Sequence, residues 1–539
     1  MTTLSSSRGS PLEGSNPSPW PLFVLYALAF GLLLVNHGVY WDSWIHHGND
    51  PGFIFKLTVD SGQPLTALLY AHILTLEQGP WLHRLLAFCG YFAAALLFMR
   101  VLGSVALLDR FSRFSLAALF ALIPVNGARV SGANLKAPFG YPLFFLGVFV
   151  GDYALRHRRQ GLKWLAAGIF TLSFFTFSNL VFYGLFLLFV LWRDPPKTRQ
   201  FNHLWDFTRR NIMFLPPPVL FWTARTLWMT PSGNYTSFNQ VTPASMLKAL
   251  LLVPQVVITS FADVLDSLFH PPSMVMVITL TMLAYHLLPA PEQRHPRLHR
   301  MLLIIGPLAF FAAIYAYLAV GKLPRHYDWD GRHQLLTPLG IALTLYGGLL
   351  WSALKLKLQD RTLKLGMALL IALCISRNIT VMLEYQRDWY KQAAIMAHLK
   401  THETQAKIEP YTHFEIDDQL SAFNGANRTL RYYEYTGLLH RTFGDERRMA
   451  KGIQQRSPPP FDAVQRRAAF LSDYRPVAPQ MIIRIEHGTY DLTQLRRVVH
   501  LLMLEHLRPE RFKNKILQVI KLTANPIPAA AQPPFGERR

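Results

Sequence analysis

The stretch that decides the fold is the apolar run from Trp20 to Val39 together with the polar segment that follows it at once. That segment reads Tyr40-Trp41-Asp42-Ser43-Trp44-Ile45-His46-His47-Gly48-Asn49-Asp50. A helix of roughly 20 apolar residues crosses a bilayer, and Trp and Tyr gather where hydrocarbon meets water. The sequence therefore predicts a spanning helix whose end holds carboxylates and imidazoles at the membrane surface. The alternative interpretation is a plain polar loop rimmed by anchoring aromatic residues.

Composition extends this prediction to the whole chain of 539 residues. Only 16% of the residues are charged and 51% are hydrophobic, whereas soluble proteins carry about 25% charged residues. The formal net charge of +22 comes largely from short loops between apolar runs, where Lys and Arg set orientation. We therefore expect an α-helical polytopic membrane protein with a lipid bilayer, and no nucleic acid, as its partner. Cys89 and Cys374 both lie in apolar runs and predict neither a disulfide nor a metal site.

Hydropathy and positive charge together predict about eleven crossings, with the N-terminus and the basic loops in the cytoplasm. The predicted spans are 20–39, 83–103, 113–126, 138–155, 162–177, 178–193, 211–229, 272–289, 300–320, 334–353 and 363–383. The apolar segment Met246 to Phe269 is expected to be re-entrant or interfacial, because a crossing there would move the basic loop Arg294 to Arg300 to the outside. An odd number of spans places the C-terminal part on the face opposite the N-terminus.

Three regions follow from this topology. Residues 1–19, rich in Ser, Pro and Gly, are expected to form a disordered cytoplasmic N-terminus, and residues 20–384 the transmembrane module. Residues 385–539 contain no run long enough to span, so they predict a small outward-facing α/β or helical domain with a loose tail from residue 525. Within it, periodicity predicts helices at 386–402 and 491–507 and strands at 412–416 and 480–485.

The candidate acids are Asp42 and Asp50, in the first outward loop. An ionised carboxylate near a membrane surface can act as a general base or hold a metal ion, and Asp42 is the better placed of the two. His46 and His47 are adjacent and point in different directions on a helix, so they predict contact with substrate or headgroup rather than a metal pair. The residues specify no cofactor, and a divalent cation is left open.

The candidate anion-binding residues lie late in the chain. Arg325, Arg332 and His333 come just before the span that begins at residue 334. The planar guanidinium of Arg matches phosphate oxygens, so Arg332 is a candidate phosphate clamp. Contact with ordinary anionic headgroups is the alternative.

Further positive charge falls at the outer ends of spans. Arg225 and Arg377 are not favoured there by orientation, and such charges usually face a polar cavity; snorkelling to the interface is the alternative. Arg129 and Lys136 add to the same side. Together these residues predict an outward cavity that attracts phosphate or pyrophosphate.

This layout resembles the membrane-embedded glycosyltransferases of the GT-C superfamily. The resemblance rests on an acidic residue just after the first span, on about a dozen spans, on an outward C-terminal domain and on the late stretch Gly331-Arg332-His333-Gln334-Leu335-Leu336-Thr337-Pro338. It implies that Asp42, or Asp50, is the catalytic acid and that Arg332 contacts phosphate. The first loop lacks the paired acidic residues of several subfamilies, which leaves the identity of the base and the question of a metal open.

What the resemblance implies is an inverting transfer of a sugar from a polyprenyl phosphate to a glycan, lipid or protein acceptor. The expected location is the bacterial inner membrane, with the active site facing the periplasm. Two other classes stay open. An O-antigen ligase or polymerase would use lipid pyrophosphate. A lipid or glycan transporter would carry charges in mid-span and inverted halves.

Overall fold

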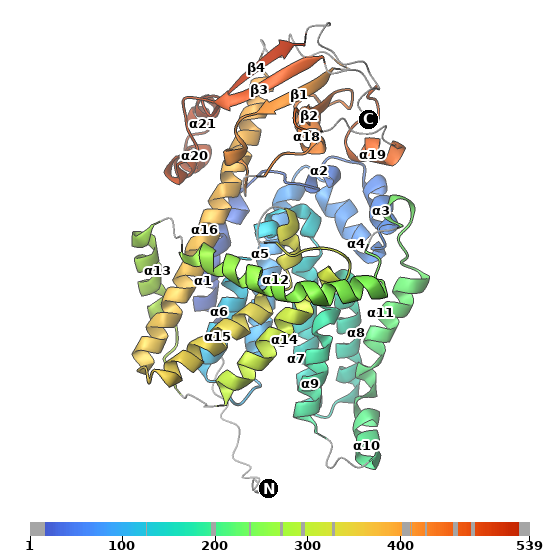
Figure 1. The fold of residues 1–539 in the computed structure, drawn as a ribbon, viewed down its shortest axis with the longest axis vertical. Helices are drawn as coiled ribbons and strands as arrows, with labels where there is room; N and C mark the ends of the chain where they lie inside the picture. The colour runs from blue at the N-terminus through green and yellow to red at the C-terminus, as the bar shows by residue number, and fades with distance from the viewer. Residues whose placement is uncertain are drawn as a thin grey trace.

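The computed structural model describes residues 17–125, 127–195, 201–236, 239–269, 273–292, 297–325, 329–401, 410, 412–425, 428–455, 462–475 and 480–527. Most of the predicted disordered N-terminus and the end of the predicted tail lie outside these residues. The described chain is a long helical bundle with a small sheet and short helices at one end (Figure 1).

A helix overlaps each of the eleven predicted spans. These helices are α1 (Pro19–Phe30), α5 (Gly79–Leu102), α6 (Arg110–Leu122), α7 (Ala137–Arg156), α8 (Gln160–Thr176), α9 (Tyr183–Arg193), α11 (Pro216–Leu227), α13 (Met274–Leu287), α14 (Leu298–Leu318), α15 (Pro338–Lys355) and α16 (Asp360–Leu399). The amphipathic α10 (Phe201–Asn211) precedes α11.

Five described helical segments are long and apolar enough to cross a membrane. They are Gly79–Leu102, Gly132–Arg156, Pro243–Phe269, Leu298–Leu318 and Asp360–Leu399. Shorter apolar helices, among them Pro19–Val35 and Met274–Leu287, pack beside them. The chain is thus a helical protein with membrane-spanning segments, and the number of crossings stays a prediction.

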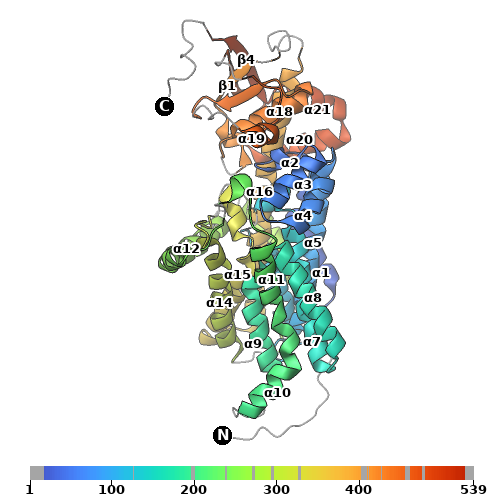
Figure 2. The same cartoon turned by 90° about the vertical axis from the view of Figure 1, so that its right-hand side faces the viewer.

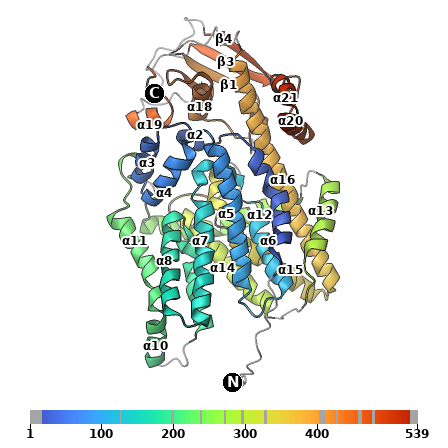
Figure 3. The ribbon, with the colours of Figure 1, turned by 180° about the vertical axis from the view of Figure 1, so that it is seen from behind.

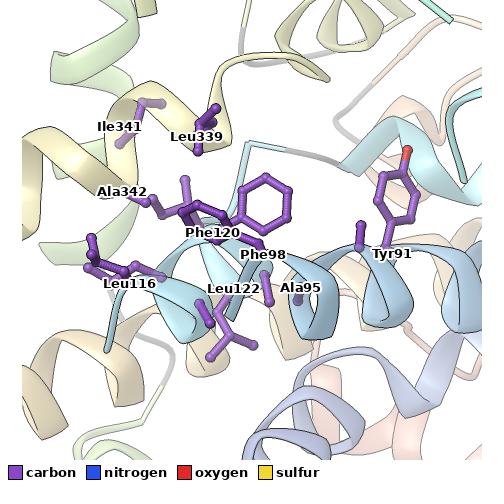
Figure 4. Packing of buried hydrophobic residues seen from close by; sticks show 14 of the residues in the cluster. Tyr91, Ala95, Phe98, Leu116, Phe120, Leu122, Leu339, Ile341 and Ala342 are labelled. Atoms are coloured by element: carbon purple, nitrogen blue, oxygen red, sulfur yellow. The ribbon is translucent and has the colours of Figure 1, made fainter. Parts of the chain in front are cut away.

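The bundle core is built from aromatic and aliphatic side chains that face one another across helices. Figure 4 shows Phe98 of α5 and Phe120 of α6 beside Leu339 at the start of α15. The Phe98 and Phe120 ring centroids are 5.3 Å apart with tilted planes, a spacing at which aromatic pairs attract. These contacts join helices that are far apart in sequence.

One apolar helix, α12 (Pro243–Phe269), does not run with the others. It lies across α14 in Figure 1, and Figure 2 shows it projecting from the side of the bundle. Its Leu251 and Phe269 side chains are exposed, while Val256 and Val264 face the bundle. The sequence predicted a re-entrant or interfacial segment here, and α12 is also among the helices long enough to cross, so its relation to the membrane stays a prediction.

Three short helices follow α1 and sit at the end of the bundle that faces the sheet (Figure 3). They are α2 (Ser43–His46), α3 (Pro51–Asp60) and α4 (Pro64–Leu69). Asp50 begins α3, because its Oδ1 accepts the Phe53 backbone N–H at 2.8 Å, as an N-capping carboxylate does. Ile54 and Leu57 then pack on Tyr70 and hold α3 against the chain that follows α4.

The C-terminal part contains a four-stranded sheet in the order β2-β1-β3-β4. The predicted strands at 412–416 and 480–485 are confirmed as β1 (His413–Asp418) and β3 (Met481–His487). The strands β2 (Met449–Gly452) and β4 (Ile520–Pro526) were not predicted. Parallel pairing joins β1 to β2 and to β3, and β4 is antiparallel to β3.

Helices surround this sheet. They are α18 (Tyr432–Phe443), α19 (Ala463–Ala468), α20 (Leu495–Leu507) and α21 (Pro509–Ile516). The predicted helix 386–402 is the second half of α16, which runs unbroken for 40 residues from the bundle to the sheet (Figure 1). The predicted boundary at residue 384 therefore falls inside a continuous helix.

A buried ion-pair cluster joins α16, the C-terminal part and the first loop. The Arg428 guanidinium donates to Asp388 of α16 at 3.1 Å and to Glu434 of α18 at 2.5 Å, and all three side chains are fully buried. The Glu434 carboxylate also accepts the backbone N–H of Trp41, at 3.1 Å. Because buried charges must be paired, the three segments are fixed relative to one another.

Replacing Arg428 by Met should destabilise the fold by about 3–5 kcal/mol, because it leaves two carboxylates buried without their cation. The matched control is Arg484→Met, which breaks the half-exposed pair with Asp417 and should cost about 0–1 kcal/mol. Thermal and chemical unfolding of the detergent-solubilised protein measures both. Equal losses for the two variants would contradict a structural role for this cluster.

Candidate functional site

A cavity of about 230 Å³ opens between the first loop and the segment that precedes α15. Its acidic, basic and imidazole lining side chains are Asp42, His46, Lys136, Lys322, Arg332 and His333. Four of the predicted site residues, Asp42, His46, Arg332 and His333, are therefore brought together. The cavity thus brings together Asp42 and Arg332, which are almost 300 residues apart in sequence.

Asp42 is held from two sides. Its Oδ1 accepts the Tyr433 hydroxyl at 2.9 Å, so a residue of α18 reaches into the first loop. Its backbone carbonyl accepts Nδ1–H of His46 at 2.8 Å. One carboxylate oxygen is thereby anchored by a neutral donor, and the side chain faces the cavity.

The backbone before Asp42 is strained. Trp41 has a φ of +48°, a left-handed conformation that is rare for a bulky residue. Its N–H is bound by Glu434, and its ring stacks on Trp329 with centroids 5.3 Å apart. Strained backbone persists where surrounding contacts over-determine it, and it clusters at functional sites. The strain at Trp41 sets the direction in which Asp42 leaves the chain.

Three cations and one carboxylate lie among the described side chains that line this cavity. Arg332 lies over the Trp329 ring, with its Cζ 4.1 Å from the centroid, and donates to the Trp329 carbonyl at 3.3 Å. Lys136 Nζ donates to Gln63 Oε1 at 2.9 Å. Burial, with the charges of Arg332 and Lys136, lowers the pKa of Lys322 to about 8, and Asp330 partly opposes this shift. A cavity with this excess of positive charge is suited to an anion.

Electrostatics link the cations to the acid. Burial lowers the pKa of Arg332, and the carboxylates of Asp42 and Asp330 partly oppose that shift. The Asp42 charge is thus close enough to act on Arg332. An anion held by Arg332 would lie within reach of chemistry at Asp42.

The two imidazoles are neutral acceptors rather than charges. Burial lowers the pKa of His333 to about 3, and burial also lowers the pKa of His46. His333 Nδ1–H donates to the Leu323 carbonyl at 3.3 Å, while its Nε2 is buried with no hydrogen-bond partner in the described chain. Buried polar atoms are nearly always satisfied, so this nitrogen is a candidate acceptor for a ligand hydroxyl.

The other predicted site residues lie elsewhere. Asp50 caps α3 and pairs with Arg467 at 3.3 Å. Arg377 pairs with Glu384 at 3.5 Å on α16. Arg325 is exposed outside the cavity lining. Arg225 also does not line the cavity, although its charge acts on Lys136.

Among the described residues, no three His, Cys, Asp or Glu side chains gather to form a metal site. The divalent cation that the sequence left open therefore has no ligand set in this part of the chain. In the cavity itself, Asp42 is lined up with Lys and Arg side chains rather than with further described carboxylates. No step is assigned to a metal ion here.

Sequence reasoning missed two contributors. Lys322 lies only three residues before Arg325 and inside the same outward loop, so its charge was a usable signal. Tyr433 had no local signal, because it comes from a separate part of the chain and contacts Asp42 only through the tertiary fold.

Comparison with protein-family models, with curated proteins and with solved structures finds no match to this chain. The cavity and its side chains are therefore the features that point to a function.

Sulfate tests the cavity as an anion site, because its double charge does not change between pH 7 and 9. A bound anion favours charged Lys322, whose pKa is about 8. Burial also lowers the pKa of Lys136, in the same cavity, to about 8. Binding should therefore be strongest below pH 8 and at least about tenfold weaker at pH 9 than at pH 7 if only the charged forms bind. Isothermal titration of the purified protein measures the dissociation constant.

Lys322→Met should weaken sulfate binding and reduce its pH dependence to the part that Lys136 contributes. Lys248→Met, at an exposed position on α12, should change neither. Binding that is equally strong at both pH values in the unmodified protein would show that Lys322 does not contact the anion.

Proposed function

We propose that this chain is an integral membrane glycosyltransferase. It moves a sugar from a polyprenyl-phosphate donor to a hydroxyl of a glycan, lipid or protein acceptor. The observation that carries the proposal is that Asp42 and three cations are brought together in the described lining of one cavity at the end of a helical bundle. The resemblance to GT-C enzymes in the sequence supports the same assignment.

The cations supply positive charge that binds the phosphate of the lipid donor and stabilises the lipid phosphate as it leaves. Lys136 directly precedes α7, whereas Lys322 and Arg332 come from the stretch between α14 and α15, and all three line the cavity. Fixed charges placed where negative charge develops are usually the largest contribution to catalysis. They stabilise the phosphate oxygen as the bond to the sugar breaks.

The acceptor side of the cavity holds a base and a hydroxyl-binding group. In the transfer, Asp42 takes the proton of the acceptor hydroxyl while the oxygen of that hydroxyl forms a bond to the sugar C1. The bond from C1 to the phosphate oxygen breaks, and its electron pair stays on the lipid phosphate. Attack from the face opposite the leaving phosphate inverts C1. The unpartnered Nε2 of His333 accepts a sugar hydroxyl and orients the ring.

The bundle supplies the place for the polyprenyl chain. Its apolar helices would hold the lipid with the phosphate at the membrane surface, and the proposed location is a bacterial inner membrane with the cavity on the periplasmic face. The three cations also suit pyrophosphate, which is the donor group in the alternative of an O-antigen ligase or polymerase. A transporter would bind the lipid without needing a base at Asp42.

Asp42→Asn should lower sugar transfer by at least about 100-fold, because general-base catalysis contributes roughly that factor. Binding of undecaprenyl phosphate to the protein in nanodiscs should stay within experimental error of the unmodified chain. Transfer is measured as polyprenyl phosphate released from a panel of polyprenyl-phosphate hexoses and pentoses. Native mass spectrometry measures binding, with undecaprenol as the uncharged comparison.

Three outcomes separate the classes. Asp50→Asn should retain transfer, because that carboxylate caps a helix. If Asp50→Asn abolished transfer and Asp42→Asn remained active, the roles of the two carboxylates would be reversed. Preference for undecaprenyl pyrophosphate over the monophosphate would favour the ligase class. Binding without transfer from any donor, unaffected by Asp42→Asn, would favour a transporter.

Tyr433→Phe should lower turnover about 3–10-fold with the KM for lipid donor unchanged, because it removes one hydrogen bond, worth about 0.5–1.5 kcal/mol, from the Asp42 carboxylate. The matched control is Tyr435→Phe, which removes the same kind of bond, 3.0 Å long, to Asp418, away from the cavity lining. Steady-state kinetics measures both. Equal effects of the two variants would assign Tyr433 a purely structural role.

A further inference from the structure

The helices α20 and α21 form a hairpin whose base and tip can be told apart. At the base, the chain before α20 pairs with the chain after α21, through Gly488 N–H to the Val519 carbonyl at 3.1 Å. The tip is the turn Leu507-Arg508-Pro509 between the helices. Figures 1 and 3 show the pair beside α16, below the sheet and on the side toward the bundle.

Contacts with α16 give the direction of the hairpin. At the base, the Leu517 carbonyl lies 3.0 Å from His398 Nε2. Near the tip, Glu505 accepts the Tyr390 hydroxyl at 2.9 Å. The two α16 residues are eight positions apart, which is about 12 Å along a helix. The tip therefore points back along α16, away from the sheet and toward the bundle.

The tip lies level with the end of the first bundle helix. His37, two residues beyond the last helical residue of the Pro19–Val35 segment, has its ring 6.3 Å from that of Trp389, centroid to centroid. Trp389 adjoins Tyr390, the residue that holds Glu505. The end of the first apolar run, where hydrocarbon gives way to water in a spanning helix, is thus at the height of the hairpin tip.

The tip carries the chemistry of a membrane surface contact. Leu507 is 77% exposed and Met503, one turn earlier, is 56% exposed, so two large apolar side chains lie on one stripe. Arg508 and Arg511 are exposed beside them. Between residues 495 and 515 there are six Lys or Arg and two Glu. Apolar side chains flanked by cations are the pattern of helices that lie on anionic bilayers.

We infer that the tip of the α20–α21 hairpin rests on the anionic headgroups of the membrane that holds the bundle. Met503 and Leu507 enter the interface, and Arg508 and Arg511 bind lipid phosphates. The contact fixes the C-terminal part at a second point besides α16. It thereby keeps α18, with Tyr433 and Glu434, over the cavity. This inference needs a membrane around the bundle and does not need the proposed transfer reaction.

A fluorescent label at Leu507→Cys tests the contact in the full-length chain, with Cys89 replaced by Ser and the buried Cys374 left in place. The chain is reconstituted into phosphatidylcholine vesicles containing phosphatidylglycerol and a headgroup-region nitroxide lipid. Quenching should be several-fold stronger than for the same label at Asn525→Cys, an exposed position on β4. Equal quenching at the two positions would overturn the inference.

A second experiment tests whether the contact requires positive charge on the hairpin and negative charge on the lipid. Adding Arg508→Glu and Arg511→Glu to the Leu507→Cys chain should reduce quenching to the level at residue 525, and vesicles of phosphatidylcholine alone should do the same for the unmodified hairpin. Undiminished quenching in either case would overturn the choice of anionic headgroups as partner. Both arginines are exposed, so an unchanged thermal midpoint and circular dichroism spectrum show that the variant is folded.

Discussion

The constraint on which the rest depends is the guanidinium of Arg428, fully buried between the carboxylates of Asp388 and Glu434. Each charge is removed from water, so none can be left unpaired without a large penalty. Asp388 belongs to α16, which continues into the bundle, and Glu434 to α18 beside the sheet. One ion-pair cluster therefore fixes the orientation of the C-terminal part relative to the helices below it.

The same cluster determines how the first loop leaves the membrane helix. Glu434 binds the N–H of Trp41 and holds that residue at a φ of +48°, and the next residue is Asp42. Gly437, one turn further along α18, packs against the Trp44 ring so closely that a Cβ there would collide with it. The acid is thus aimed by a helix whose sequence lies almost 400 positions away, and the loop and the C-terminal part form one unit.

What the sequence could predict follows from which forces are local. Apolar runs identified helices in the bundle because hydrophobicity along a segment is a local property, and Asp42 and Arg332 stood out because each lies at the end of such a run. Asp50 and Arg377, also predicted at the site, do not line the cavity; their local partners are a helix N-terminus and an ion pair within α16, which the sequence pattern does not distinguish from a role in binding. The hydrogen bonds from Trp41 to Glu434 and from Tyr433 to Asp42 are tertiary contacts, which the periodicity of the sequence does not encode.

The charge of the cavity is the remaining argument for a ligand site. Burying Lys136, Lys322 and Arg332 around one carboxylate opposes folding, since each cation is partly stripped of water and repels the others. The depressed pKa of Lys322 records that penalty. A sequence selected only for stability would replace these side chains with apolar ones, as buried ion pairs can often be replaced without loss. Local conflict with the fold is expected where a protein performs its function, and a bound anion would relieve this one.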